Sequence, residues 1–161
     1  MLKKIGVLSD SHENVDIVFK AVKKMGPVDL LLHAGDGVKD VITLSKKIGI
    51  KVECVKGNCD FMVDFPEEKV ITFYDYRILL THGNLYGIKH SLNKLYFRAK
   101  ETKADIVVFG HTHVPLKIWW EDVLFFNPGS VSKPVGNNPG SCGVITVDNR
   151  GNITGEIIKM G

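Results

Sequence analysis

The first sixty residues repeat one pattern three times: a short apolar run that ends in a glycine or a polar residue. The runs are "KKIGVLSD" (3–10), "VDLLLHAGD" (28–36) and "IKVECVKGN" (50–58). Between them, "NVDIVFKAVKKM" (14–25) and "VKDVITLSKKIG" (38–49) place apolar residues at helical spacing. This alternation of strand and helix predicts a parallel sheet with right-handed crossover connections.

The second half of the chain has a different texture. Residues 68–83 are typical of two strands around a turn, 91–103 of a helix, and 104–114 of a further buried strand. Residues 115–130 and 142–160 contain short alternating strands, with "DNRGN" as a strong hairpin signal. We therefore expect an α/β fold with a mainly parallel first half and a more antiparallel second half, in two sheets stacked between helices.

Composition narrows the function classes. The 161 residues include 44% hydrophobic and 24% charged residues, and are expected to form a single domain, residues 1–161. The net charge of +3 and the lack of any Lys or Arg run longer than a pair give no strong nucleic-acid signature. No stretch has the length and polarity of a membrane span or a signal peptide, so no membrane partner is expected.

The number and spacing of the cysteines indicate the cellular compartment. The chain has three cysteines, Cys54, Cys59 and Cys142, and no C-x-x-C pair. An odd number without that pairing argues against a disulfide framework and against a structural zinc knuckle. We expect a cytoplasmic protein.

Metal-binding side chains follow five of the predicted strands. In an open α/β sheet, ligands bind beyond the carboxyl ends of the strands, so these side chains should meet in one crevice. Four of the six histidines belong to this group. The expected ligands are Asp10, His12, Asp36, Asn58, His82, His111 and His113.

The local spacing has a physical reason. In an extended chain, residues i and i+2 point the same way, so Asp10 and His12 are expected to address one ion together. Glycines at 35, 57, 83 and 110 allow the backbone to turn sharply beside the ligands.

The ligand set indicates both the metal and its chemistry. Imidazole, carboxylate and one amide suit Mn²⁺, Fe²⁺, Co²⁺, Ni²⁺ or Zn²⁺ better than Mg²⁺ or Ca²⁺ alone. Seven ligands exceed one tetrahedral site and favour two divalent ions with a shared carboxylate. Asp36 is the expected bridge, since it is the Asp of the set with no histidine at i+2. Two ions roughly 3.5–4 Å apart would activate a bridging hydroxide for in-line attack on phosphorus.

Five motifs occur in a fixed order: D-x-H (10–12), G-D-x-x-x-D (35–40), G-N-x-D (57–60), H-G (82–83) and G-H-T-H (110–113). In this order they resemble the calcineurin-like metallophosphoesterases. The "GNCD" and "NPGS" segments resemble the small bacterial and archaeal phosphodiesterase branch of that superfamily. The resemblance covers nearly the whole chain.

The resemblance implies a four-layer α/β/β/α sandwich of two mixed sheets flanked by helices. It implies hydrolysis of phosphodiesters or monoesters with Mn²⁺ or a similar ion. Asp10, His12 and His113 would hold one ion, and Asn58, His82 and His111 the other, with Asp36 shared between them. It also implies a structural role for Asp40 near the second loop.

Two residues of the "GNCD" turn are expected to act catalytically. Asn58 would donate to phosphate oxygens, and Asp60 would orient water or a neighbouring group. Many relatives have a histidine at the position of Cys59, where it is thought to protonate the leaving oxygen. A thiol is a poor substitute for imidazole, so we expect the best activity on diesters with acidic leaving groups, such as aryl esters.

Two other functions remain as alternatives to a phosphodiesterase. One is a non-catalytic interaction scaffold, because a retromer subunit shares this fold. The other is a nuclease, which would need a basic groove and usually an added domain. A small phosphodiester is the expected substrate, and a homodimer or homotetramer the expected assembly.

Several residues keep two interpretations. His33 is either a satisfied core histidine or a partner that orients a ligand. His90 lies outside every motif and is interpreted as a surface residue. Adjacent Trp119 and Trp120 should face opposite sides of a strand, one in the core and one at an interface or the rim of the site. The loop "NPGSVSKPVGNNPGS" (127–141) is either a binding loop or flexible surface.

Overall fold

The computed structural model describes residues 2–161, and these residues form two five-stranded mixed sheets. In spatial order, the first sheet contains β10 (Ile153–Lys159), β9 (Ser141–Asp148), β1 (Leu2–Leu8), β2 (Leu30–His33) and β3 (Lys51–Cys54). β1, β2 and β3 run parallel, as the sequence predicts. The C-terminal hairpin adds β9 antiparallel to β1, so this sheet is mixed.

The second sheet follows the same plan. Its strands, in spatial order, are β4 (Glu68–Phe73), β5 (Tyr76–Thr81), β6 (Ile106–Val108), β8 (Val123–Asn127) and β7 (Leu116–Trp120). β5, β6 and β8 are parallel at its centre, while β4 and β7 pair antiparallel at its two edges.

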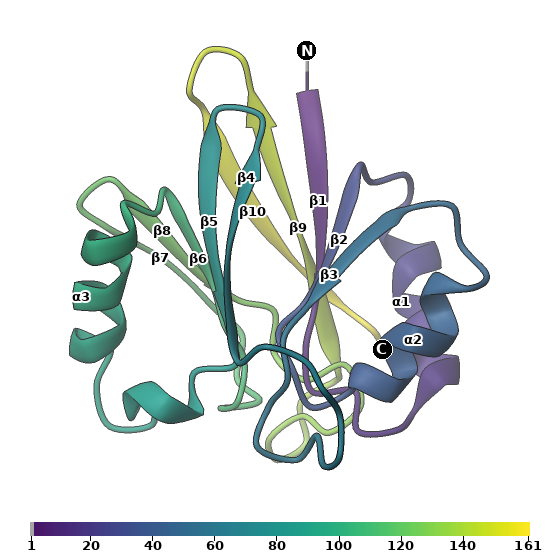
Figure 1. Cartoon of the computed structure of the whole chain (residues 1–161). Helices are drawn as coiled ribbons and strands as arrows, with labels where there is room; N and C mark the ends of the chain where they lie inside the picture. The colour runs from purple at the N-terminus through teal and green to yellow at the C-terminus, as the bar shows by residue number, and fades with distance from the viewer. Residues whose placement is uncertain (1) are drawn as a thin grey trace.

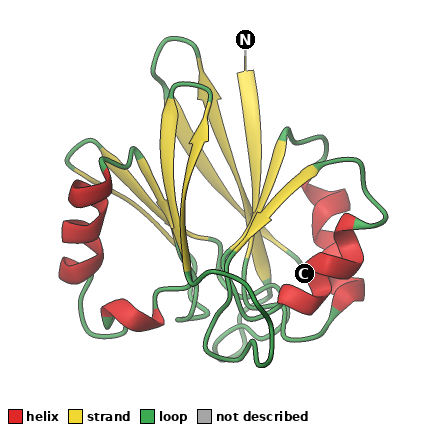
Figure 2. Cartoon of the chain, viewed as in Figure 1, coloured by secondary structure: helices red, strands yellow, loops and turns green. Residues whose placement is uncertain are grey.

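Helices cover the outer faces of both sheets. α1 (Val15–Met25) and α2 (Val38–Ser45) lie against the first sheet, and α3 (Asn93–Thr102) against the second, with a short 3₁₀ helix η1 (Asn84–Tyr86) before it (Figures 1 and 2). The expected four-layer α/β/β/α sandwich is confirmed.

Local signals set the helix ends. The Asn14 side chain accepts a hydrogen bond from the Ile17 N–H at 3.2 Å and caps α1, as expected for this residue type. α2 ends at Ser45, before the expected stop at Gly49. There the N–H groups of Lys47 and Ile48 both bond to the Leu44 carbonyl, and the chain turns so that Ile48 packs on the core.

Successive side chains of each strand point to opposite faces of the sheet, so the core has three layers, one between the sheets and one on each outer face. Ile5, Val7 and Leu32 face the other sheet, where they meet Ile78 and Leu80. Leu8 and Leu31 on the opposite face pack against α1 and α2, and Leu79 and Phe125 pack against α3. Strands buried on both faces explain why the sequence shows continuous apolar runs rather than alternation.

The paired tryptophans behave as their positions predict. Trp120 stacks on Tyr96 of α3 with ring centroids 4.1 Å apart, and Trp119 is exposed. The placement of Trp119 at an interface stays a prediction. Within residues 2–161, none of the helices is long and apolar enough to cross a membrane.

Loops from both sheets meet at one end of the sandwich. The chain leaves β1 and β2 at this end, and the loops after β3, β5 and β6 lie beside them (Figure 1). The Gly110 N–H bonds to the His82 carbonyl at 3.0 Å, and the Asp10 N–H to the Gly35 carbonyl at 3.0 Å. The crevice beyond the strand ends is therefore formed by segments that are far apart in sequence.

Candidate metal centre

Two carboxylates and three imidazoles converge at this loop end. Asp10 Oδ1 lies 3.2 Å from His113 Nε2, and Asp36 Oδ2 lies 3.2 Å from His82 Nε2. His12 Nε2 lies 3.8 Å from Asp10 Oδ1 and 4.0 Å from Asp36 Oδ2. The ligand atoms of Asp10, His12 and His113, and those of Asp10, Asp36 and His82, lie within 4.8 Å of one another in each group.

These side chains converge by a different route from the one the strand spacing suggested. β1 ends at Leu8, and Asp10 and His12 lie beyond it with left-handed φ angles of 53° and 48°. Asp36, His111 and His113 are also left-handed, with φ of 58°, 70° and 62°. Non-glycine residues rarely adopt this conformation, and strain of this kind concentrates at functional sites.

Two buried polar atoms at the centre make no hydrogen bond with any described residue: Asp10 Oδ1 and His82 Nε2. They lie 3.8 Å apart. Buried polar atoms are normally paired, since an unpaired one costs free energy. A carboxylate oxygen and an imidazole nitrogen that face each other without donors fit a divalent cation, because both are ligand atoms for one.

Main-chain carbonyls orient two of the imidazoles. His82 Nδ1 donates to the Ala34 carbonyl at 2.8 Å, and His113 Nδ1 donates to the Lys133 carbonyl at 2.7 Å. A carbonyl oxygen accepts only, so each Nδ1 carries the proton and each Nε2 is the ligand atom of the neutral ring. This arrangement is the one that ligating histidines commonly show.

The charges at the centre reinforce one another. Burial raises the pKa of Asp36, but attraction to His82 outweighs it and lowers the pKa to about 2. Burial also opposes the charge on His82, yet the carboxylates of Asp36 and Asp10 raise its pKa. Both aspartates are thus carboxylates at neutral pH and are ready to bind a cation.

Asp60 holds the loop that carries Asp36. Its Oδ2 accepts from the N–H groups of Asp36 at 2.7 Å and Gly57 at 2.8 Å. Its Oδ1 accepts from Gly37 at 2.9 Å and Val38 at 3.0 Å, at the start of α2. These contacts make Asp60 a positioning residue, and its expected catalytic role stays a prediction.

Gly57 lies under Asp36 for steric reasons. A Cβ at Gly57 would fall 2.1 Å from Asp36 Oδ1, so a side chain there would displace the carboxylate. Close approach of backbone to a ligand group is a common requirement for glycine.

A chain of buried hydrogen bonds links His33 to the loop that follows β1. His33 Nδ1 accepts from the Gly35 N–H at 3.1 Å, so its Nε2–H donates to Ser11 Oγ at 2.9 Å. Ser11 Oγ donates in turn to Asp40 Oδ2 at 2.6 Å. Burial lowers the pKa of His33 to about 4 and keeps the ring neutral. His33 therefore ties together the loops that carry Asp10 and Asp36, and Asp40 has the structural role implied for it.

The structure brings the other two expected ligands, His111 and Asn58, less fully to the centre. The His111 ring lies against His82 with centroids 5.1 Å apart, and the His111 backbone N–H donates to Asp10 Oδ2 at 3.1 Å. Asn58 is exposed, and its amide contacts Cys59 Sγ at 3.6 Å. The roles of Asn58 and His111 as ligands stay predictions.

Cys59, which is not among the seven expected ligands, lies beside the centre. Its N–H donates to Asp36 Oδ1 at 2.8 Å, and its Sγ lies within 4.8 Å of ligand atoms of His12 and Asp36. Burial and the charge on Asp36 raise the pKa of the thiol, so it remains protonated at neutral pH.

The long loop 127–141 supports the site, which the sequence left open. Ser130 Oγ donates to the Asp10 carbonyl at 2.7 Å, and Ser132 Oγ donates to the Ser11 carbonyl at 2.8 Å. The same loop supplies the Lys133 carbonyl that orients His113. Sequence reasoning missed Ser11, Ser130 and Ser132, because a loop serine gives no local signal of contacts with residues distant in sequence.

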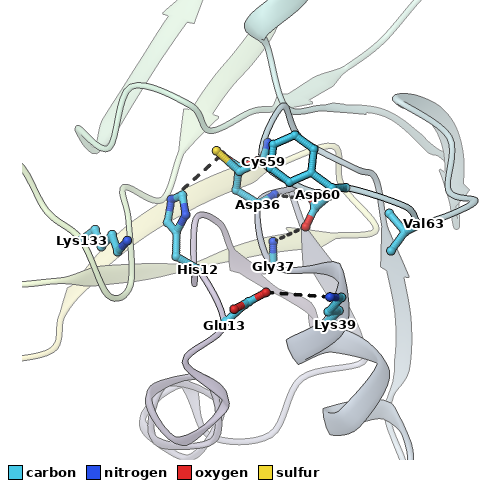
Figure 3. A pocket seen from close by; sticks show the side chains of 10 residues that line it. His12, Glu13, Asp36, Gly37, Lys39, Cys59, Asp60, Val63 and Lys133 are labelled. Atoms are coloured by element: carbon cyan, nitrogen blue, oxygen red, sulfur yellow. Dashed lines mark hydrogen bonds and ion pairs between the residues drawn. The ribbon is translucent and has the colours of Figure 1, made fainter.

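A hollow of about 200 Å³ opens beside His12, Asp36 and Cys59. Lys133 lies next to His12 on one side, Val63 lies on the far side, and Glu13 and Lys39 lie between them along the rim (Figure 3). A small ligand in this hollow would contact the converging side chains directly.

Comparison with known proteins agrees with this geometry. Residues 3–150 match the model of the calcineurin-like phosphoesterase superfamily domain. The chain is 36% identical over 146 residues to YsnB, a probable metallophosphoesterase of Bacillus subtilis, with 89% of this chain and 83% of that protein covered. It is 37% identical over 112 residues to phosphodiesterase YfcE of Escherichia coli, with 63% and 56% covered.

Two solved structures show the same fold. A predicted phosphoesterase from Streptococcus pneumoniae has a TM-score of 0.82 and 31% identity, over 99% of this chain and 90% of that one. Vps29 of Entamoeba histolytica in complex with Zn²⁺ has a TM-score of 0.77 and 23% identity over 100% of both chains, which shows the fold alone.

The ordered motifs, the two packed sheets, the converging carboxylates and imidazoles and the matched domain all agree. The chain therefore belongs to the calcineurin-like phosphoesterase superfamily and is a metal-dependent phosphoric ester hydrolase.

Proposed function

We propose that this chain is a phosphodiesterase that hydrolyses small phosphodiesters with two divalent ions, and that Asp36 is their shared ligand. The carrying observation is the pair of buried, unpartnered atoms, Asp10 Oδ1 and His82 Nε2, at the centre of the carboxylate and imidazole cluster. Mn²⁺ is the first ion to test, followed by Ni²⁺, Co²⁺, Fe²⁺ and Zn²⁺, since the ligand set suits all of them.

The residues would divide into two ligand groups. Asp10, His12 and His113 would hold one ion, and Asn58, His82 and His111 the other. When bound, divalent ions lower the pKa of water toward neutrality and neutralise charge on phosphate oxygens. Within this frame the chain's own groups set the geometry: the Ala34 and Lys133 carbonyls fix the imidazoles, and Asp60 fixes the Asp36 loop.

Protonation of the leaving oxygen is the step for which this site offers the poorest acid. Cys59 stands where an imidazole would be useful, and its raised pKa makes the thiol a poor acid. We therefore propose a preference for diesters whose leaving oxygen is already acidic, such as aryl esters.

Two alternatives to this function remain, a scaffold and a nuclease. Vps29 has the same fold, so the fold does not exclude an interaction scaffold. The presence of all seven expected ligand residues favours an enzyme, because a scaffold is free to lose them. A nuclease would need a basic groove, and the hollow includes Glu13 as well as Lys39 and Lys133.

The test is hydrolysis by chelator-treated protein after addition of each ion. Bis(p-nitrophenyl) phosphate and p-nitrophenyl phosphate measure diesterase and monoesterase activity. We expect diester hydrolysis that depends on the added ion, is lost in His82→Asn and is unchanged in His90→Asn, a matched control at an exposed histidine. No hydrolysis with any ion would favour the scaffold instead.

The cytoplasmic location and the homodimeric or homotetrameric assembly stay predictions. Size-exclusion chromatography with light scattering measures the assembly directly.

A further inference from the structure

The hollow beside the metal centre has an apolar wall as well as a polar one. His12, Asp36 and Cys59 line the polar side, while Phe61 and Val63 contribute apolar surface. Both come from the loop that follows the "GNCD" turn and leads to β4. A substrate held by its phosphate at the polar side would place its remaining part against this apolar surface.

Phe61 is an exposed aromatic residue that lines the hollow. Its side chain is 73% exposed although it is a large aromatic group, and it lines the hollow. The preceding residue, Asp60, is fixed because its carboxylate accepts from four backbone N–H groups. An exposed aromatic ring that lines the hollow next to this fixed residue is available to a ligand.

Backbone strain lies next to this ring. Met62 has a left-handed φ of 57° and is fully exposed, so no buried contact of its own side chain explains that conformation. Strained positions persist where the surrounding structure holds them, and they concentrate at sites that contact ligands. The left-handed residue Met62 directly follows Phe61, which lines the hollow.

The hollow carries cationic as well as anionic side chains, since Lys39 and Lys133 line it together with Glu13, Asp36 and Asp60. Lys39 and Lys133 are exposed at the rim, and Lys39 Nζ lies 3.9 Å from Glu13 Oε1. The Lys133 carbonyl accepts from His113 Nδ1 at 2.7 Å, which places the Lys133 backbone beside the metal centre. A volume of about 200 Å³ is below the range of drug-sized pockets and fits a ligand about as large as one ring and a phosphate.

We propose that Phe61 is a specificity-determining residue that stacks on an aromatic ring of the substrate. The substrate class is then a small phosphodiester that carries a flat aromatic ring, either an aryl ester or a nucleotide. This inference rests on the proposed function of the metal centre.

The test uses pairs of phosphonates that differ only by a ring and cannot be hydrolysed. Phenylphosphonate and methylphosphonate form one pair; the methylene phosphonate analogues of adenosine 5′-monophosphate and ribose 5-phosphate form the other. Dissociation constants are measured by calorimetry with the Mn²⁺-loaded protein. We expect the ring-bearing member of at least one pair to bind about fivefold or more tightly, since stacking on an aromatic side chain is worth at least that much.

Three variants locate the effect. Phe61→Ala should remove the preference and leave methylphosphonate binding unchanged, and Phe61→Tyr should retain it. Phe97→Ala is the matched control, because Phe97 is 64% exposed on α3 and does not line the hollow. A preference confined to the first pair indicates an aryl ester, and one confined to the second pair indicates a nucleotide.

Equal binding within both pairs would overturn the inference, as would a preference that survives in Phe61→Ala or disappears in Phe61→Tyr. Failure of the proposed function is recognised separately. In that case none of the four phosphonates binds with any divalent ion, and the inference falls with it.

Discussion

The two sheets contribute different chemistry to the site. Loops of the first sheet carry both buried carboxylates, Asp10 and Asp36, and the imidazole of His12. Loops of the second sheet carry the other three imidazoles, those of His82, His111 and His113. The closest contacts, Asp36 with His82 and Asp10 with His113, join a carboxylate of one sheet to an imidazole of the other. The site therefore forms when the sheets pack together, because a buried charge needs a partner.

The two sheets also differ in how their ligands are held. In the first sheet, side chains such as Asp60, Ser11 and His33 bind the loops. In the second sheet, His82 is oriented by a carbonyl of the first, that of Ala34. Groups of the first sheet thus hold its own loops and also orient His82 of the second sheet. Four substitutions test this difference.

The largest effect is expected from removing the shared carboxylate. Asp36→Asn should lower metal affinity and activity by more than roughly 10–100-fold. That range is the loss expected when a residue that only hydrogen-bonds to a metal ligand is removed. Metal content by mass spectrometry and diester hydrolysis measure it. Near wild-type values for both would contradict the assignment of Asp36 as the bridge.

The next effect is a pH dependence of stability from His33. Its folded pKa of about 4 lies below the unfolded value of 6.5, so the unfolded state binds a proton first. Chelator-treated protein should therefore lose stability as pH falls from 6.5 to 4, by about 3 kcal/mol from this residue. Urea unfolding at a series of pH values measures the loss.

The control for this prediction is a pair of histidine variants. His33→Gln should flatten the decline between pH 6.5 and 4, and His90→Gln at the exposed position should not. If the wild-type and His33→Gln curves run parallel, His33 does not stay neutral in the folded protein.

A smaller effect is expected at Asp60. Asp60→Asn would turn an amide NH₂ toward backbone N–H donors, and the Asp36 loop should loosen. We expect Mn²⁺ affinity to fall about 10–100-fold, as for other outer partners of a metal site. Asp64→Asn, an exposed aspartate of the same loop, is the matched control.

The Asp60→Asn variant also distinguishes a positioning role of Asp60 from a catalytic role. If Asp60 acts through the Asp36 loop, saturating Mn²⁺ should restore much of the activity. Activity that stays low at saturating Mn²⁺ would instead support the catalytic role expected from the sequence.

The smallest effect is a gain at Cys59. Cys59→His should raise turnover of alkyl diesters by about tenfold or more relative to aryl diesters, since a positioned general acid contributes at least that much. Cys59→Ser is the control for loss of the thiol alone. An unchanged ratio of alkyl to aryl turnover would show that leaving-group protonation does not limit this enzyme.

The sequence predicts the fold well because its signals are local. Strands such as β1 and β2 are buried on both faces, so they appear as apolar runs with polar residues where they stop. The early end of α2 was not predicted, because it depends on Ile48 packing against the core.

The structure brings five of the seven expected ligand residues together, but by a geometry that the sequence does not predict. Asp10, Asp36 and His82 are recognisable from their positions after strands. Their left-handed or carbonyl-bound arrangement is not, because it depends on contacts between loops distant in sequence. The contacts of Ser130 and Ser132 with the first loop have the same origin: 120 or more residues separate the partners.

The most direct test of the account is electron paramagnetic resonance of the protein titrated with Mn²⁺. Two ions that share Asp36 should give two equivalents of bound Mn²⁺ per chain and a spin-coupled spectrum, which Asp36→Asn abolishes. One equivalent per chain, or two equivalents with the spectrum of isolated ions, would contradict the shared centre.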